Sequence, residues 1–327
     1  MRSRLFVSGL AAILALLVLS CEEPFTPKAP FVPRPVVICI ISATEHNGVY
    51  LMPVSATVAR TYDVAGLDPM ANTTDPFDTA AVVSVTVGNV NDQLRLFKLP
   101  RADAGRYTTK EFRFQDHGLF HMYGVYTLSV TTGKGEQLRA TTTVPPRRMI
   151  GTSYQFPAGV TPITTNPHWT FDWNDEQRND HLYFPKLLLQ YQVITPESTV
   201  DKKLEIPLTY VEKDGKKVPV YPSFTRDLSV TYDFSAMATA IESIAEVDTV
   251  KSHYKIGWLY FQLIEYDTNL SNFYASSHGY LDAYSIRVDE STYTNVTGGV
   301  GVFGSSFFNN IFFEMKLQYI RSLGYRM

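Results

Sequence analysis

Cysteine is nearly absent from the 327-residue chain, which contains two such residues, Cys21 and Cys39. Two cysteines exclude a zinc site of the multi-cysteine kind. Charged residues are also few, at 19% of the chain, and the formal net charge is -3. No basic field is therefore available to hold a phosphate backbone, and we expect no binding to nucleic acid.

Catalytic motifs are missing as well. The sequence contains no G-x-S-x-G motif, no Walker A loop and no calcium-binding loop. Residues 299–304 formally match the dinucleotide motif G-x-G-x-x-G, but too few residues follow to complete a βαβ unit, so we expect glycines that let strands bend or approach closely. His117 and His121 lack the glutamate of a zincin, because Gly118 occupies its place. We therefore predict no catalytic residue, no metal site and no cofactor, and expect that the chain is not an enzyme.

No apolar run is long enough to span a bilayer. The longest one, Leu5–Leu19, has about 15 residues against the roughly 20 that a membrane helix needs, and Arg2 and Arg4 precede it. This pattern is typical of a signal peptide, here residues 1–20. Residues 18–21, Val-Leu-Ser-Cys, resemble the bacterial lipobox, so we predict that Cys21 carries palmitate-type acyl chains. The alternative is an ordinary signal peptide with a chance cysteine.

The residues after Cys21 fit an anchored protein. Glu22 and Glu23 resemble the surface-export signals of Bacteroidota lipoproteins, and two or more acyl chains attach a protein stably to a membrane. We therefore expect a lipid anchor in the outer membrane. Residues 21–35 contain five prolines and predict a semi-rigid polyproline stalk. A PxxP ligand for an SH3-like domain is the alternative.

Aromatic residues are abundant, with 20 Phe and 20 Tyr, which excludes general disorder. Segments of period 2, rich in Val, Thr, Tyr and Phe, recur beyond the stalk and predict a mainly β fold. Seven short strands over residues 36–146 predict an immunoglobulin- or transthyretin-like sandwich, with a hairpin turn at Gly133–Glu136. Cys39 lies in the first of these strands, and we expect a buried thiol there.

Residues 147–327 predict a second β-rich domain with one or two short helices. Trp169, Phe171 and Trp173 alternate and predict a strand with an aromatic core face. Ser235 is the expected N-cap of a helix that ends near Val247, and a weaker helix is expected over 270–283. The final strands are expected near 284–290, 299–304 and 311–320.

Two sets of residues are candidates for binding or chemistry. Aromatic side chains in a polar stretch predict a sugar- or partner-binding patch, with the core of an amphipathic helix as the alternative; they are Phe273, Tyr274, Tyr280 and Tyr284. Asp172 and Asp175 lie close to Trp173 and are candidate carboxylates of a glycan hydrolase, with solvated turn residues as the alternative.

Several segments together resemble a family of two-domain Bacteroidota lipoproteins, a domain of unknown function that is often encoded beside TonB-dependent outer-membrane transporters. The segments that carry this resemblance are Cys21–Phe25, Val36–Ile38, Tyr126–Val130, Ala140–Pro145, Phe171–Trp173 and Asn295–Gly304. The resemblance implies an accessory protein of nutrient uptake with a TonB-dependent transporter as its partner. The alternatives are a surface hydrolase acting on glycans and a structural, adhesin-like module.

Overall fold

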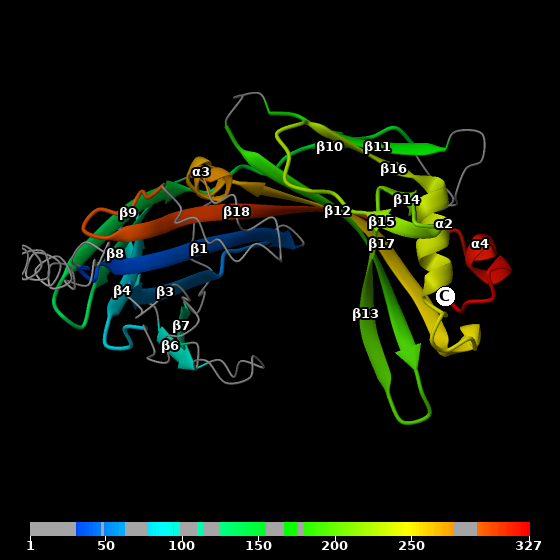
Figure 1. Ribbon diagram of the computed structural model, residues 1–327, viewed down its shortest axis with the longest axis horizontal. Coiled ribbons are helices and arrows are strands. Elements are labelled where there is room, and N and C mark those ends of the chain that lie inside the picture. Colours follow the sequence, from blue (N-terminus) through cyan, green and yellow to red (C-terminus); the bar gives the residue numbers. More distant parts are fainter. Residues whose placement is uncertain are drawn as a thin grey trace, which may run out of the picture. The chain divides into compact units, whose positions relative to one another are not determined.

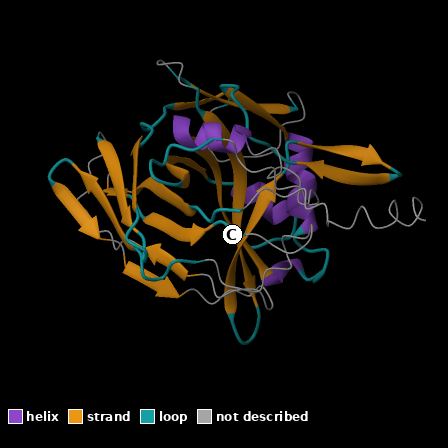
Figure 2. Ribbon diagram, turned by 60° about the vertical axis from the view of Figure 1, so that its left-hand side comes forward, coloured by secondary structure: helices purple, strands orange, loops and turns teal. Residues whose placement is uncertain are grey.

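A computed structural model describes residues 31–46, 49–62, 77–93, 95–98, 110–113, 124–154, 167–175, 180–276 and 293–327. Strands dominate these residues and helices are few and short, as Figures 1 and 2 show. The predicted mainly β fold is confirmed. Among the described residues, no helix is both long and apolar enough to cross a membrane.

The elements of the first half of the chain are β1 (Pro35–His46), β2 (Val49–Leu51), β3 (Val54–Arg60), β4 (Val82–Val87), β5 (Val90–Gln93), β6 (Arg95–Lys98), β7 (Lys110–Arg113), β8 (Val125–Thr131), β9 (Gln137–Thr143) and β10 (Ile150–Thr152). Those of the second half are β11 (His168–Trp173), β12 (Leu182–Ile194), β13 (Thr199–Ile206), β14 (Thr209–Lys213), β15 (Lys216–Val220), β16 (Ser229–Asp233), α2 (Phe234–Ser243), η2 (Lys251–His253), β17 (Tyr254–Tyr266), α3 (Thr268–Ser276), β18 (Val300–Phe313) and α4 (Leu317–Ser322).

One nine-stranded sheet connects the two ends of the sequence. Its order is β13-β12-β17-β18-β1-β3-β7-β6, and β2 pairs with β1 off this path. The late strand β18 runs parallel to β1 and antiparallel to β17, so blue β1 and orange β18 lie side by side in Figure 1. This sheet crosses the boundary expected between residues 146 and 147. The division into two domains stays a prediction. Strand β18, which belongs to the second predicted domain, pairs with β1 of the first and with β17 of the second.

The first core lies between the large sheet and a four-stranded sheet of order β5-β4-β8-β9. Val37, Cys39 and Ile41 of β1 alternate into this core, together with Phe303 and Phe307 of β18. The expectation of a buried thiol at Cys39 is confirmed, since its side chain is fully buried. Burial raises the pKa of this thiol, which keeps it protonated and unreactive.

The predicted hairpin at Gly133–Glu136 is also confirmed, because it joins β8 to β9 with Thr131 opposite Gln137. Gly135 has φ +84°, a left-handed conformation that glycine adopts without steric cost. The Gly133 N–H donates to Asp78, and the Glu136 carboxylate pairs with Arg60 at 2.5 Å. The turn is thereby fixed to the β3 end of the large sheet.

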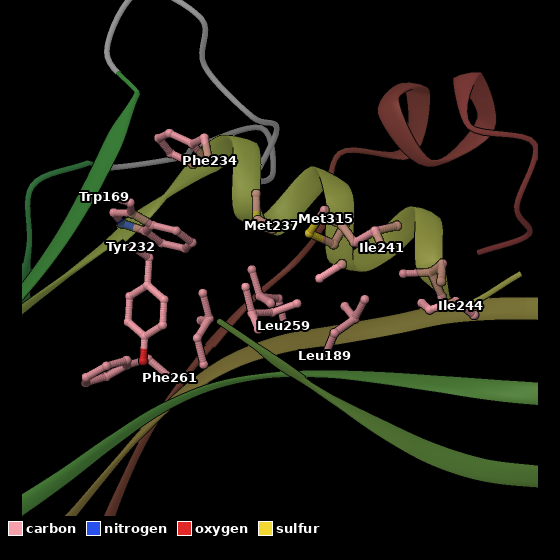
Figure 3. Packing of buried hydrophobic residues seen from close by; sticks show 14 of the residues in the cluster. Trp169, Leu189, Tyr232, Phe234, Met237, Ile241, Ile244, Leu259, Phe261 and Met315 are labelled. Carbon is pink, nitrogen blue, oxygen red and sulfur yellow. The ribbon is translucent and has the colours of Figure 1, made fainter. Parts of the chain in front are cut away.

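The second core is rich in aromatic rings. Trp169, Phe171 and Trp173 of β11 are all buried, as their alternation predicts. Phe171 stacks on Phe261 of β17 with a centroid distance of 4.1 Å and an interplanar angle of 3°. Helix α2 covers this core, and Figure 3 shows Met237 and Ile241 pointing toward β17 and β12. Aromatic pairs of this kind contribute about 0.5–1.5 kcal/mol beyond the area that they bury.

Both predicted helices exist, with different boundaries. Helix α2 begins at Phe234 with Asp233 as its N-cap residue, so the N-cap predicted at Ser235 is wrong by two positions. The Asp233 carboxylate contacts the His168 ring at 2.8 Å and makes no cap hydrogen bond. Helix α3 begins at Thr268, earlier than expected, and Asp267 accepts the Leu270 N–H at 2.8 Å.

The C-terminal region differs most from expectation. The two strands predicted at 299–304 and 311–320 form one 14-residue strand, β18, followed by the short helix α4. The prediction was wrong because the serines and asparagines at 305–310 interrupt the apolar pattern. Two of these side chains make polar contacts with the segment before β10, since Ser305 donates to the Thr143 carbonyl and Asn309 accepts the Arg148 N–H. The strand expected at 284–290 lies outside the described residues.

Candidate functional site

A groove of about 670 Å³ opens where β12, β13 and β17 run together. Amide, charged and aromatic side chains line it, among them Gln190, Gln192, Lys203, Lys255, Trp258 and Glu314. Binding sites for small molecules are concave and combine apolar surface with a few polar groups. This groove has that composition, and we take it as the candidate binding site.

A β-bulge exposes the tryptophan of this groove. Leu189 pairs with Leu259 and Tyr191 pairs with Ile256, so Gly257 and Trp258 together oppose the single residue Gln190. Without the extra residue, the alternation of the strand would turn Trp258 into the core. With the bulge, Leu259 is buried and Trp258 is 46% exposed. Bulges commonly re-aim side chains in this way beside functional sites.

Gly257 allows the close approach that the bulge needs. A Cβ atom at this position would lie 3.2 Å from the Gln190 carbonyl oxygen, which is tighter than ordinary van der Waals contact. Glycine within a strand often marks a bulge for this reason. The local sequence therefore supports the unusual placement of an indole ring on the surface.

The polar groups of the groove are partly held in place. Gln192 donates through Nε2 to Asp201 Oδ1 at 2.9 Å, and Lys203 Nζ lies 5.7 Å from the centroid of the Tyr260 ring. Burial, with a smaller contribution from Tyr254, raises the pKa of Tyr191, so this hydroxyl stays protonated at neutral pH and available as a donor. The groove thus offers an indole face beside hydrogen-bonding and charged groups, which suits a polar ligand with one apolar face.

Two of the four predicted aromatic candidates lie in a second cluster. Tyr274 of α3 stacks on Phe224 at 5.3 Å and meets Tyr266 edge to face at 5.3 Å, while Phe273 lies 6.0 Å from Tyr274. Phe273 and Tyr274 are half-buried. Phe184 of β12 extends the cluster by stacking on Phe224 at 4.9 Å.

The cluster joins the helix α3 to the sheet. Phe273 and Tyr274 stay candidates for a partner-binding patch, since part of each side chain packs on protein and the rest is open to solvent. Tyr280 and Tyr284, the other two candidates, lie outside the described residues, as do the predicted lipidation site Cys21 and the histidines His117 and His121.

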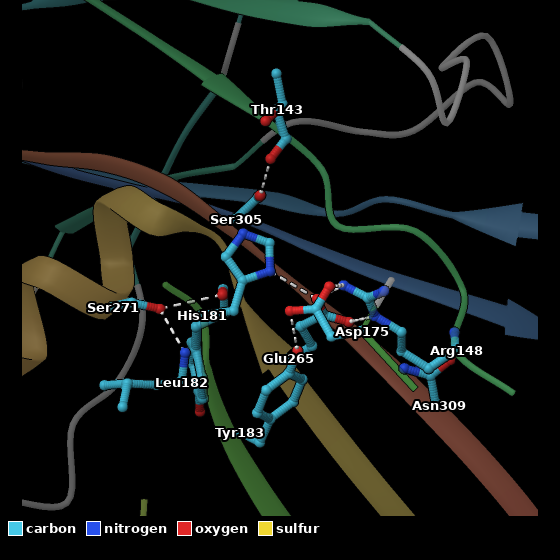
Figure 4. A network of polar contacts seen from close by, with 11 residues as sticks. Thr143, Arg148, Asp175, His181, Leu182, Tyr183, Glu265, Ser271, Ser305 and Asn309 are labelled. Carbon is cyan, nitrogen blue, oxygen red and sulfur yellow. Dashed lines mark hydrogen bonds and ion pairs between the residues drawn. The ribbon is translucent and has the colours of Figure 1, made fainter. Parts of the chain in front are cut away.

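A buried network of charges occupies the space between the two cores (Figure 4). Arg148 binds Glu265 through two hydrogen bonds, from Nε to Oε2 at 2.7 Å and from Nη2 to Oε1 at 2.5 Å. His181 Nδ1 lies 2.7 Å from Glu265 Oε1, and Tyr183 donates to Asp175 at 3.1 Å. Glu265 has no exposed surface. Burial raises the pKa of the Tyr183 hydroxyl, which therefore remains a donor.

This network bears on the two carboxylates that the sequence suggested for a hydrolase. Asp175 is buried beside Arg148, with its Oδ1 3.2 Å from Nη2, and accepts from Tyr183. Asp172, three residues earlier, is exposed on β11. Asp175 is therefore engaged by a guanidinium and a hydroxyl and is buried away from solvent. The arrangement is that of a structural network joining strands.

The glycine-rich segment 299–304 belongs to this architecture too. Gly301 has φ +121° and lies so close to the Val37 carbonyl that no side chain fits, and Gly304 lies against Leu270 of α3. These glycines permit the close approach that the sequence predicted. Among the described residues, no group of three or more His, Cys, Asp or Glu side chains is placed to hold a metal ion.

Sequence reasoning missed the Trp258 groove. The one signal for it was Gly257 followed by Trp258 inside a long apolar strand, because a glycine there marks a bulge and a bulge turns the next side chain outward. Comparison with known proteins adds no assignment: no family model matches the chain, and no curated protein is significantly similar to it.

Proposed function

We propose that this chain is a lipoprotein of the outer membrane, anchored through Cys21, that acts as a non-enzymatic binding and accessory subunit of a TonB-dependent transporter in nutrient uptake. The lipobox-like residues 18–21, the acidic pair behind Cys21 and the proline-rich stalk support the anchor. The observation that carries the binding role is the groove with the bulge-exposed Trp258.

Trp258 presents part of an aromatic side chain to solvent within a groove, where a ligand can cover it. Fully burying a large apolar side chain gains about 1.5–3 kcal/mol, and Trp258, which is 46% exposed, forgoes part of this gain in the free protein. Binding energy at interfaces concentrates on such residues, with Trp and Tyr strongly enriched. A ligand that covers the indole recovers this free energy, and the lysines and amides around it set the orientation.

The anchor is tested by mass spectrometry of the mature protein from its native host. We expect an N-terminal acylated Cys21 and no residues 1–20, and Cys21→Ser releases the protein from the membrane fraction. Unmodified Cys21, or a leader still attached, would refute the anchor.

The accessory role is tested by cross-linking in cells, gentle detergent extraction and affinity purification of the full chain. We expect a TonB-dependent transporter in the eluate, and recovery of none under cross-linking contradicts the role. The same experiment separates the alternatives, because an adhesin-like module would recover no transporter.

The groove is tested with two matched variants. Trp258→Ala and Tyr221→Ala each remove an aromatic side chain that is 46% exposed, but only Trp258 lines the groove. We expect Trp258→Ala to slow transporter-dependent growth on the limiting nutrient at least tenfold in competition, and Tyr221→Ala to leave growth unchanged. Equal growth of both variants would remove the groove from the proposal.

A further inference from the structure

Strands β1 and β18 separate at one point in the large sheet. Their parallel pairing runs from Val36 opposite Val300 to Thr44 opposite Phe308 and stops there, although β18 continues to Phe313. Beyond this point β2 pairs with β1, and a cavity of about 620 Å³ opens beside β18. It is lined by Glu45, Arg147, Met149, Ile150, Asn309 and Ile311, among others.

The backbone of β18 presents unused hydrogen-bonding groups to this cavity. The Asp267 N–H donates to the Ser305 carbonyl, so odd-numbered residues of β18 direct their backbone groups toward β17. The β17–β18 register is regular to Phe313, so Asn310 and Phe312 direct theirs to the opposite side. No strand in the part of the chain that the structure describes pairs with β18 there.

The side chain of Asn309 adds a donor at the same place. Its Oδ1 accepts the Arg148 N–H at 2.8 Å, while no hydrogen bond is formed by its Nδ2 to any described residue. Asn309 is only 4% exposed and lines the cavity. A buried donor without a partner costs about 1–3 kcal/mol, so the polar contacts of β18 are incomplete at this point.

We propose that the edge of β18 from Asn309 to Phe313 binds an extended segment of a partner protein by β-strand addition. A polypeptide strand supplies alternating N–H and C=O groups as hydrogen-bonding partners for the unpaired backbone groups of Asn310 and Phe312. Five residues of strand cover about 16 Å. Its inward side chains pack against Ile150 and Ile311 and are therefore apolar.

The shape of the cavity favours a single strand over a second copy of this chain. The cavity beside the edge is lined by Glu45 of β1 and by the residues 147–150. A folded copy would bring its own set of these flanking residues together with its own β18 edge. A single extended segment has no such flanks. This inference rests on the accessory role proposed above and specifies how the partner docks.

Photo-cross-linking in intact native-host cells tests the proposal with the full, processed chain. p-Benzoylphenylalanine replaces Met149, which lines the cavity and is 81% exposed, and replaces Val247, 99% exposed and absent from the cavity lining, as the control. Irradiation should give one product at position 149, with the adduct on an extended segment of another protein. The control position should give less than a tenth of that yield.

Two backbone-directed variants make the test specific. Phe312→Pro removes an N–H of the edge that faces away from β17 and leaves the β17 pairing intact, whereas Phe312→Ala removes the same ring and keeps the N–H. We expect cross-linking at position 149 to fall at least tenfold with Phe312→Pro and less than twofold with Phe312→Ala. Should Phe312→Pro fail to fold, amide hydrogen exchange at Asn310 and Phe312 replaces it, and both amides should slow at least tenfold in the purified complex.

Each outcome decides the question. An adduct on this chain, an adduct on a second copy, no adduct, equal loss with both variants, or unchanged exchange would each overturn strand addition. An adduct on a protein other than a TonB-dependent transporter, with the expected variant pattern, would confirm strand addition and refute the transporter partnership.

Discussion

Replacing Arg148 by Met removes the cation from the buried network while keeping an unbranched side chain in its place. Arg148 supplies two hydrogen bonds to Glu265, whose side chain has no exposed surface, and approaches Asp175 at 3.2 Å. Removing one partner of a buried pair costs about 3–5 kcal/mol, because the remaining charge stays buried without compensation. We therefore expect Arg148→Met to lower the free energy of unfolding by about 3–5 kcal/mol.

Urea titration of a Cys21→Ser chain, which carries no lipid, measures this loss. Arg226→Met is the matched control, since Arg226 pairs with Asp180 at 3.1 Å on the surface and such pairs contribute about 0–1 kcal/mol. Adding Glu265→Gln to Arg148→Met removes both charges and keeps an acceptor for His181, so about half or more of the loss should return. The reasoning fails if Arg148→Met costs no more than Arg226→Met, or if the double variant is no more stable than Arg148→Met.

Three further perturbations have defined outcomes. Burial raises the pKa of Asp267 above its ordinary value, so the stability linked to this carboxyl is complete below the unfolded-chain pKa and declines as the pH rises through the folded-state pKa. Asp267→Asn should therefore gain stability relative to the native chain in thermal melts as the pH rises above about 4, and a constant difference contradicts this. Gly301→Ala places a Cβ against the backbone of β1, whereas the Cβ of Gly135→Ala, also at positive φ, meets nothing within 4 Å. Gly135→Ala should lower the free energy of unfolding by about 1–3 kcal/mol through backbone strain alone, and Gly301→Ala should lower it by more. Equal losses would exclude the close contact at Gly301. In a Cys21→Ser chain, Cys39 should react with a thiol reagent at about pH 8 only on unfolding, because it is fully buried and burial raises its pKa, and rapid labelling of the folded chain would contradict this.

The alternation of apolar and polar residues along the sequence correctly predicted which side chains of a strand share a face. Trp169, Phe171 and Trp173 share one face because successive side chains of a strand point to opposite sides, and that rule needs no knowledge of the partner strand. The hairpin at Gly133–Glu136 was predicted in the same way from residues that favour a tight turn. Helix boundaries were less accurate, because the Asp233 carboxylate is engaged by His168 rather than by the helix that it precedes.

Pairing between distant strands carries no local signal. Nothing in residues 35–46 indicates that they pair with residues 300–313, and the polar residues 305–310 read as a break rather than as the middle of a strand. Their polarity has a reason that only the fold provides. Ser305 donates to the Thr143 carbonyl and Asn309 accepts from the Arg148 N–H, so they satisfy backbone groups buried between the two cores.

The Trp258 groove escaped prediction because a bulge reverses the alternation from which the faces of a strand are inferred. Reading β17 with strict period 2 assigns Trp258 to the core with Ile256, and only the extra residue opposite Gln190 turns it outward. A site built on a β-bulge cannot be predicted from the alternation of residues unless a glycine within the strand is taken as the sign of the bulge.

Strand β18 links the features from which the strand-addition proposal is built. Phe303 and Phe307 belong to the first core, Phe313 packs against the second, and Asn309 lies between them in contact with Arg148. A partner segment on this edge would therefore meet a strand that packs into both cores of the described residues. Rigid edges lose little conformational entropy on binding, which favours strand addition at this position over the ends of the sheet. The same rigidity requires the Arg148–Glu265 pair to be intact, so Arg148→Met should weaken cross-linking at position 149, whereas Arg226→Met should leave it unchanged.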